Sequence, residues 1–139
     1  MYSKGINRVK LSQVAPTAIH HHFSKIASRY RRLRITDLEP IAFVARELEE
    51  LGRVEAADIG CGAGRYDLLL CKFLGDKLGL ACVDANADML EALDTHLKEC
   101  DVSNFMTVNS KAERLPFPSG ALDCVCTFNA VHHFNLPDF

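Results

Sequence analysis

The sequence lacks the segments and motifs that mark several large classes of protein. No apolar run approaches the ~20 residues that a membrane-spanning helix needs, and the N-terminus has no apolar signal-peptide core. None of the six cysteines forms a C-x-x-C pair, so neither a zinc ribbon nor a thioredoxin-like site is indicated. With 139 residues, 48% of them hydrophobic, the composition predicts one globular domain in the cytoplasm with no membrane partner. In that reducing compartment we interpret the cysteines as small buried apolar residues.

Acidic residues are missing from the first 36 positions. This segment contains eight lysines and arginines, which give it a charge of +8, whereas residues 37–139 carry a charge of −10. Apolar residues in the segment recur at helical spacing, so we interpret residues 1–36 as a basic helical arm. The preferred interpretation is that the arm is solvated or docks on the chain's own acidic domain. The alternative is that it binds nucleic acid or an anionic substrate.

Strand and helix patterns alternate from Val54 onward. Each expected strand is a short apolar run, and each expected helix carries apolar residues three or four positions apart. This alternation predicts a parallel sheet with right-handed helical crossovers. Before it, a capping-box pattern at residues 36–39, with Thr36 as N-cap, predicts a helix that ends at Gly52. The expected strands cover residues 54–59, 78–84, 104–109 and 122–130, and the expected crossover helices cover residues 65–74 and 87–99.

A glycine loop without a phosphate-binding signature lies between the first expected strand and the helix that follows it. Its glycines have the order G-x-G-x-G at residues 60–64, whereas the dinucleotide-binding fingerprint has the spacing G-x-G-x-x-G. The lysine and the serine or threonine of a P-loop are also missing. The glycines allow close approach of the backbone, but the pattern argues against a bound pyrophosphate.

Asp84 ends the second expected strand, 20 residues beyond Gly64. A carboxylate at that position can accept hydrogen bonds from the hydroxyls of a ribose. In an open α/β sheet, the glycine loop and this acid meet at the carboxyl ends of the strands. Their combination predicts a ligand that contains ribose.

The stretches ADIGCGAGR, CVDANADML and SKAERLPFPSGALDCVCTFNAVHHF occur in this order along the chain. Together they resemble the ordered motifs of class I S-adenosylmethionine-dependent methyltransferases, in the style of the ubiquinone/menaquinone-biosynthesis-like group, over residues 54–134. The resemblance implies an α/β fold with a Rossmann-like, doubly wound and mostly parallel sheet in the strand order 3-2-1-4, with N-terminal helices. The segment HHFSKIASRYRRLR resembles the lid helix that often precedes the domain in this group.

The remaining strands of that family fold have no sequence to form from after residue 139. We therefore expect residues 37–139 to be an S-adenosylmethionine-binding domain that is truncated at its C-terminus. The fourth strand would then be an open edge with apolar faces, which predicts self-association through that edge.

The resemblance also implies roles for single residues. Asp58 and the backbone of the glycine loop would surround the methionine part of the cofactor, and Asp84 would bind the ribose. Lys111 stands where many relatives have an acid that accepts a hydrogen bond from adenine; lysine has no acceptor, so Glu113 is the alternative. Tyr30 of the lid helix would close over the cofactor or pack on the sheet. The residues implied to contact S-adenosylmethionine are Asp58, Gly60, Cys61, Gly62, Gly64, Asp84, Ala85, Met89, Lys111, Ala112, Glu113, Asn129 and Tyr30, and no metal ligands are implied.

The implied reaction is transfer of a methyl group from S-adenosylmethionine to a small-molecule acceptor. Because the sulfonium is already a good leaving group, the main task of the protein would be to align the acceptor with the methyl group. The motifs mark no catalytic residue. His132 and His133, after the fourth expected strand, are candidate bases, with local packing as the alternative.

Two other functions stay open at this point. The first is a tRNA methyltransferase, because the arm is basic and IHHHFSKIASR faintly resembles wobble-uridine tRNA methyltransferases. The second is a fragment that binds the cofactor without catalysis, because the family fold is expected to be incomplete.

Overall fold

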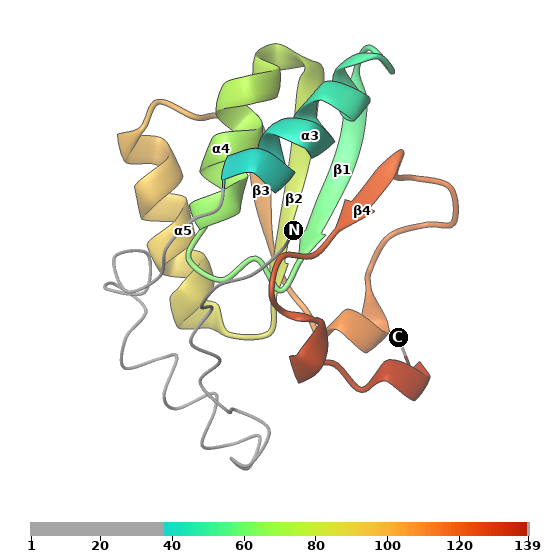
Figure 1. Cartoon of the computed structure of the whole chain (residues 1–139). Helices are drawn as coiled ribbons and strands as arrows, with labels where there is room; N and C mark the ends of the chain where they lie inside the picture. The colour runs from blue at the N-terminus through green and yellow to red at the C-terminus, as the bar shows by residue number, and fades with distance from the viewer. Residues whose placement is uncertain (1–37, 139) are drawn as a thin grey trace.

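Four parallel strands form the centre of the structure, in the order β3-β2-β1-β4 (Figure 1). The structure is a computed structural model that describes residues 38–138. The strand order and the parallel pairing confirm the fold class expected from the sequence. The strands are β1 (Val54–Ile59), β2 (Leu78–Asp84), β3 (Phe105–Asn109) and β4 (Cys124–Cys126).

Within residues 38–138 the α-helices are α3 (Leu38–Glu49), α4 (Arg65–Leu74) and α5 (Ala87–Glu99). The bounds of α4 and α5 are those expected from the sequence. Asn86 caps α5, because its Oδ1 accepts hydrogen bonds from the backbone N–H groups of Asp88 and Met89 at 3.0 and 3.2 Å. α3 ends before Gly52, which has a φ of 81°. Thr36, the expected N-cap of α3, lies outside the described residues.

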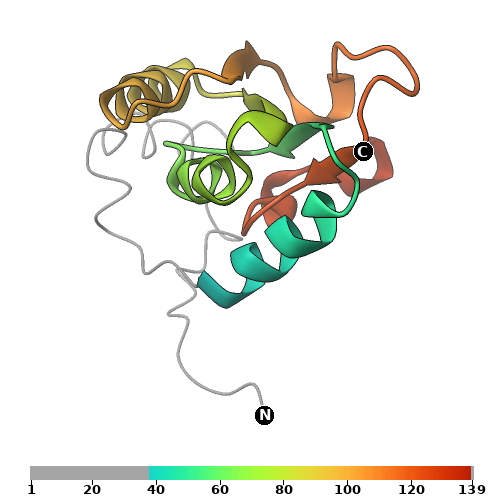
Figure 2. The same ribbon diagram turned by 90° about the horizontal axis from the view of Figure 1, so that it is seen from above.

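The three helices cover one face of the sheet, and loops with short 3-10 helices cover the other (Figure 2). On the helical face, alternate strand residues such as Val54 and Leu80 pack against α3, α4 and α5. On the opposite face, Ile59 and its neighbours pack against Phe134 and the chain that follows β3. Burial on both faces explains why β1 and β2 are nearly continuous apolar runs in the sequence.

β4 is shorter than the strand expected from the sequence, because it comprises three residues instead of residues 122–130. Asp123 still joins β1: its backbone N–H donates to the carbonyl of Glu55 at 2.8 Å, and its Oδ2 accepts from the N–H of Glu55 at 2.8 Å. Beyond the strand, Asn129 has a left-handed φ of 58° and the chain turns away. The expectation that Asn129 ends the fourth strand is therefore wrong.

β3 begins at Phe105, one residue later than expected. Asn104 instead uses its side-chain amide to donate to the carbonyl of Gly75, at 2.9 Å, and to that of Leu78. The short 3-10 helices of the described chain are η3 (Gly75–Lys77), η4 (Ala112–Arg114), η5 (Val131–His133) and η6 (Leu136–Asp138).

No helix between residues 38 and 138 combines the length and the apolar character that crossing a membrane requires. The basic arm of residues 1–36 lies outside the described part of the chain, so its role as a lid and the division from residues 37–139 stay predictions.

Candidate functional site

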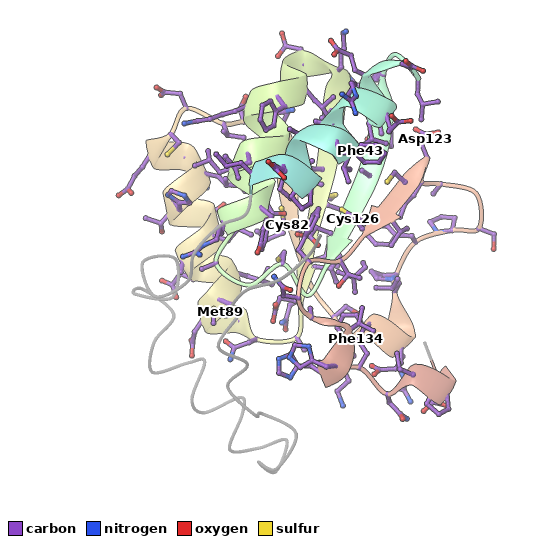
Figure 3. The ribbon with its side chains drawn as sticks, viewed as in Figure 1. Phe43, Cys82, Met89, Asp123, Cys126 and Phe134 are labelled. Carbon is purple, nitrogen blue, oxygen red and sulfur yellow. The ribbon has the colours of Figure 1, made fainter. Side chains whose placement is uncertain are left out.

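A pocket of about 600 Å³ lies at the carboxyl ends of the strands. Its walls come from the glycine loop, the junction of β2 and α5, η4, and the chain after β4. Met89 and Phe134 lie at this end of the sheet, whereas Asp123 lies at the other end of β4 (Figure 3). Open α/β sheets bind ligands at the carboxyl ends of their strands, so the pocket occupies the position that the sequence predicts.

Packing inside the protein explains two of the loop glycines. Gly60 and Gly64 have φ angles of 75° and 84°, in the left-handed region. A Cβ on Gly60 would lie 2.5 Å from the Cβ of Ala130, and a Cβ on Gly64 would lie 2.8 Å from Cγ of Leu93. At these two positions the protein's own side chains, Ala130 and Leu93, therefore approach the loop backbone closely.

Asp84 holds the glycine loop from the end of β2. Its Oδ2 accepts a hydrogen bond from the backbone N–H of Gly62 at 2.9 Å, and its Oδ1 accepts one from the N–H of Asn86 at 2.8 Å. The carbonyl of Val83 also accepts a hydrogen bond from the N–H of Gly60 at 2.7 Å. Each carboxylate oxygen has more than one lone pair, so Asp84 can still accept hydrogen bonds from a ligand in the pocket that it lines.

Glu113 joins η4 to the chain after η5. Its Oε1 accepts a hydrogen bond from the backbone N–H of Asn135 at 2.7 Å, and this bond lowers the pKa of Glu113. Lys111 and Ala112 line the pocket beside it. One oxygen of Glu113 is thus used within the protein, and the carboxylate stays an acceptor at the pocket wall.

Tyr66 is a pocket residue that the sequence analysis missed. Its ring stacks on that of Phe128, with centroids 4.8 Å apart and 23° between the planes. Its hydroxyl accepts a hydrogen bond from Nδ2 of Asn129 at 2.9 Å, and all three residues line the pocket. The available sequence signal was the position of Tyr66 in the first turn of α4, directly after the glycine loop.

The two candidate bases occupy different positions relative to the pocket. His132 and His133 both belong to η5 and are exposed, with ring centroids 4.0 Å apart. His133 is one of the residues that line the pocket, and His132 is not. His133 is therefore the better placed of the two.

Most of the residues expected from the sequence meet in this one pocket. Asp58 and Gly64 do not line it, and Tyr30 lies outside the described residues. No histidine, cysteine, aspartate and glutamate side chains of residues 38–138 are grouped so that they could hold a metal ion. The expected residues that line the pocket are Gly60, Cys61, Gly62, Asp84, Ala85, Met89, Lys111, Ala112, Glu113, Asn129 and His133.

Two buried carboxyl groups flank the glycine loop in the sequence. Asp58 on β1 and Asp67 in the first turn of α4 are 1% and 0% exposed. Burial raises the pKa of Asp58 well above its usual range, with the charges of Asp67 and Asp84 acting in the same direction, and burial raises the pKa of Asp67 to about 7. Burial also raises the pKa of the Cys61 thiol, which makes it a poor nucleophile at neutral pH.

Comparison with known proteins connects this geometry to a family. A sequence profile described as a methyltransferase domain matches residues 56–139, a range that includes the glycine loop, Asp84 and the chain after β4. The chain belongs to the methyltransferase domain family. The family match agrees with the resemblance to class I S-adenosylmethionine-dependent methyltransferases that the sequence motifs carry.

The relatives of this methyltransferase-family chain are distant in sequence. A methyltransferase-family protein of Dictyostelium discoideum is 27% identical over 124 residues, which cover 89% of this chain and 44% of that protein. The demethylmenaquinone methyltransferase of Listeria welshimeri is 23% identical over 134 residues, which cover 93% and 56% of the two chains. The solved structure of the YcgJ protein from Bacillus subtilis is 27% identical with a TM-score of 0.63, over 71% of this chain and 41% of that chain. The chain thus spans about half the length of the relatives that it matches.

Proposed function

We propose that the chain binds S-adenosylmethionine in this pocket and transfers its methyl group to a small-molecule acceptor. The observation that carries the proposal is the Asp84 carboxylate, which lines the pocket and is oriented by the backbone N–H groups of Gly62 and Asn86. A carboxylate that accepts hydrogen bonds suits the two hydroxyls of a ribose. Each hydrogen bond to a charged group contributes about 1.5–3 kcal/mol. The family match supports the same assignment.

The chemistry of the pocket residues fits the three parts of the cofactor. Gly64, the N-cap of α4, makes no side-chain cap hydrogen bond, and the partial positive charge of this helix N-terminus suits the carboxylate of the methionine part. Ala85 and Met89 offer an apolar surface for the adenine. In this proposal the methionine part is assigned to the pocket residues Gly60, Cys61, Gly62 and Asn129, with Asp58 and Gly64 supporting the loop from outside the pocket. The adenine is assigned to Ala85, Met89, Lys111, Ala112 and Glu113, and closure over the cofactor to Tyr30.

The bound cofactor supplies an electrophilic methyl group, so the residues of the chain have to orient the acceptor and exclude water. The stacked rings of Tyr66 and Phe128 form an apolar wall for the acceptor. The hydroxyl of Tyr66 accepts a hydrogen bond from Asn129, so its own proton can be donated in a hydrogen bond to an atom of the methyl acceptor. His133 is the candidate base where the acceptor has to lose a proton.

A small molecule is the proposed methyl acceptor because one relative is a demethylmenaquinone methyltransferase. The pocket volume of about 600 Å³ falls within the range of small-ligand sites, roughly 300–1,000 Å³, which suits the cofactor. The proposal includes a cytoplasmic location, which the six free thiols favour. The basic arm that suggested a tRNA substrate lies outside the described residues. Self-association stays a prediction that gel filtration can test; β4 lies at an edge of the sheet with Val125 52% exposed.

Calorimetry with S-adenosylmethionine and S-adenosylhomocysteine tests the proposed function. We expect the wild type to bind both ligands and Asp84→Ala to bind them at least ~10-fold more weakly, because hydrogen bonds to a charged acceptor are lost. Asp123→Ala is the matched control, since Asp123 also accepts a backbone N–H but lies at the other end of β4 (Figure 3). Equal affinities for wild type and Asp84→Ala, or no binding by the wild type, would contradict the proposal.

A further inference from the structure

Asp67 has no part in the function proposed above, although it is buried beside Asp58. Among the described residues, Oδ1 of Asp58 and both side-chain oxygens of Asp67 accept no short hydrogen bond, and the groups close enough to lower the pKa of Asp67 are the Cys82 thiol, its own backbone N–H and the Asp58 carboxyl. Buried polar atoms are nearly always paired, so three such oxygens in one place need an explanation. A proton on Asp58 can be donated to Asp67, and the two carboxyl groups therefore titrate as a coupled pair.

Within residues 38–138, the side-chain groups that shift the pKa values of the two carboxyl groups are thiols and other carboxyl groups. Burial raises the pKa of each neighbouring thiol, so these thiols stay protonated at neutral pH. Figure 3 shows two of them, Cys82 and Cys126, in the middle of the sheet. Arg65 at the start of α4 lines the pocket. The facing groups are Cys61 of the glycine loop, Cys71 of α4, Cys82 and Asp84 of β2, and Cys126 of β4.

Asp58 and Asp67 each adjoin a pocket-lining residue in the chain, Ile59 and Tyr66 respectively. Cys61 and Asp84 both line the pocket. The charges of Asp67 and Asp58 help to raise the pKa of Cys61, and the charge of Asp84 acts in turn on both buried carboxyl groups. A charge on a ligand at the same wall is therefore subject to this field, which the buried position protects from screening by salt.

We propose that the Asp58–Asp67 pair makes the pocket prefer the charged cofactor over its demethylated product, and that the preference strengthens as the pair ionises. The inference rests on the function proposed above. S-adenosylmethionine carries a positive sulfonium where S-adenosylhomocysteine has a neutral thioether, and the two molecules otherwise present the same groups. A further negative charge on the pair attracts the sulfonium and leaves the thioether unaffected. Asp67 is thus a specificity-determining residue that acts through its charge, without lining the pocket.

The ratio of the Kd for S-adenosylhomocysteine to the Kd for S-adenosylmethionine, measured by calorimetry from pH 6 to pH 8, tests the inference. We expect the ratio to rise about fivefold for the wild type and to rise less for Asp67→Asn, in which only Asp58 can still ionise. Asp76→Asn makes the same change at an exposed position of η3 and is expected to follow the wild type. The ratio is the useful quantity because both ligands carry the same α-amino group, whose own titration then largely cancels.

A second measurement uses only the wild type, so it decides the question even where Asp67→Asn does not fold. Calorimetry at pH 7 in buffers of different ionisation enthalpy gives the number of protons released on binding, and S-adenosylmethionine should release more than S-adenosylhomocysteine. Equal proton release, or a ratio of Kd values that does not change with pH, would overturn the inference and leave the proposed function intact. Failure of the wild type to bind either ligand would overturn the proposed function and this inference together.

Discussion

Single residues determine the shape of the glycine loop through contacts inside the protein. Gly60 faces Ala130 and Gly64 faces Leu93, and neither position has room for a Cβ. Asp84 holds Gly62 by accepting its backbone N–H. Glycine at positions 60 and 64 is therefore required by the fold itself, in addition to any ligand that the loop binds.

We expect Gly60→Ala to lower the free energy of unfolding by about 3 kcal/mol. A left-handed conformation costs a residue with a Cβ about 1–2 kcal/mol, and overlap with Ala130 adds about 1–3 kcal/mol. Gly120 has a similar φ of 74° and nothing within 4 Å of an added Cβ, so Gly120→Ala isolates the backbone contribution. Urea denaturation measures both losses. Equal losses for the two variants would show that the contact with Ala130 has no influence on stability.

The buried carboxyl of Asp67 should make stability depend on pH. Burial raises the pKa of Asp67 from 3.8 to about 7, so the folded state binds the proton more strongly than the unfolded state does between these values. The contribution of Asp67 to the free energy of unfolding is therefore present at low pH and is lost as pH rises through this window. The slope reaches at most about 1.4 kcal/mol per pH unit.

Chemical denaturation of the wild type and Asp67→Asn at several pH values between 5 and 8 measures this effect. The wild type should lose stability relative to Asp67→Asn as pH rises. Asp76→Asn, at its exposed position, should keep a constant difference from the wild type. A constant difference for Asp67→Asn as well would contradict a buried carboxyl that ionises near neutral pH.

The strands and helices around the glycine loop could be predicted from the sequence, because their residue patterns agree with their burial in the fold. β1 and β2 are nearly continuous apolar runs, and both are buried on two faces. α5 has an N-cap and one apolar stripe, and its buried residues lie on that stripe. The ends of β4 could not be predicted in this way. Leu122 and Ala130 are apolar residues that pack inside the protein, but both lie beyond the ends of the strand.

The candidate site was predictable where a residue has a fixed place relative to one element. Asp84 was found because it ends a strand and follows the glycine loop at a characteristic spacing. Tyr66 was missed because its partner Asn129 lies far away in the sequence, so only the fold brings the two together. The burial of Asp67 could not be predicted from the sequence either. An aspartate in the first turn of a helix is ordinarily exposed and interacts favourably with the helix dipole.

The N-terminus of α5 depends on the cap that Asn86 provides. We expect Asn86→Ala to lower the free energy of unfolding by about 1 kcal/mol, because the N–H groups of Asp88 and Met89 lose their acceptor. Asn86→Asp keeps an acceptor oxygen and is the matched control, with a loss close to zero in thermal or chemical denaturation. Similar losses for both substitutions would indicate that burial of Asn86, and not capping, determines its contribution.

Across the described part of the molecule, protection from solvent decreases from the centre of the sheet to its edges. β1 and β2 are mostly buried, whereas β3 and β4 contain exposed residues such as Met106 and Val125. Amide hydrogen exchange should therefore be slowest in β1 and β2 and faster in β4, since edge elements open locally without unfolding of the centre. Uniform protection of all four strands would contradict this gradient.

The contact between Gly60 and Ala130 has a consequence for the order of folding. It joins two positions that are separated by about half of the 139-residue chain, so the intervening loop has to close before the contact can form. Contacts of such long sequence separation slow folding and tend to form after local ones. The glycine loop and the chain after β4 should thus meet late, once β1, β2 and their crossover helix have already assembled.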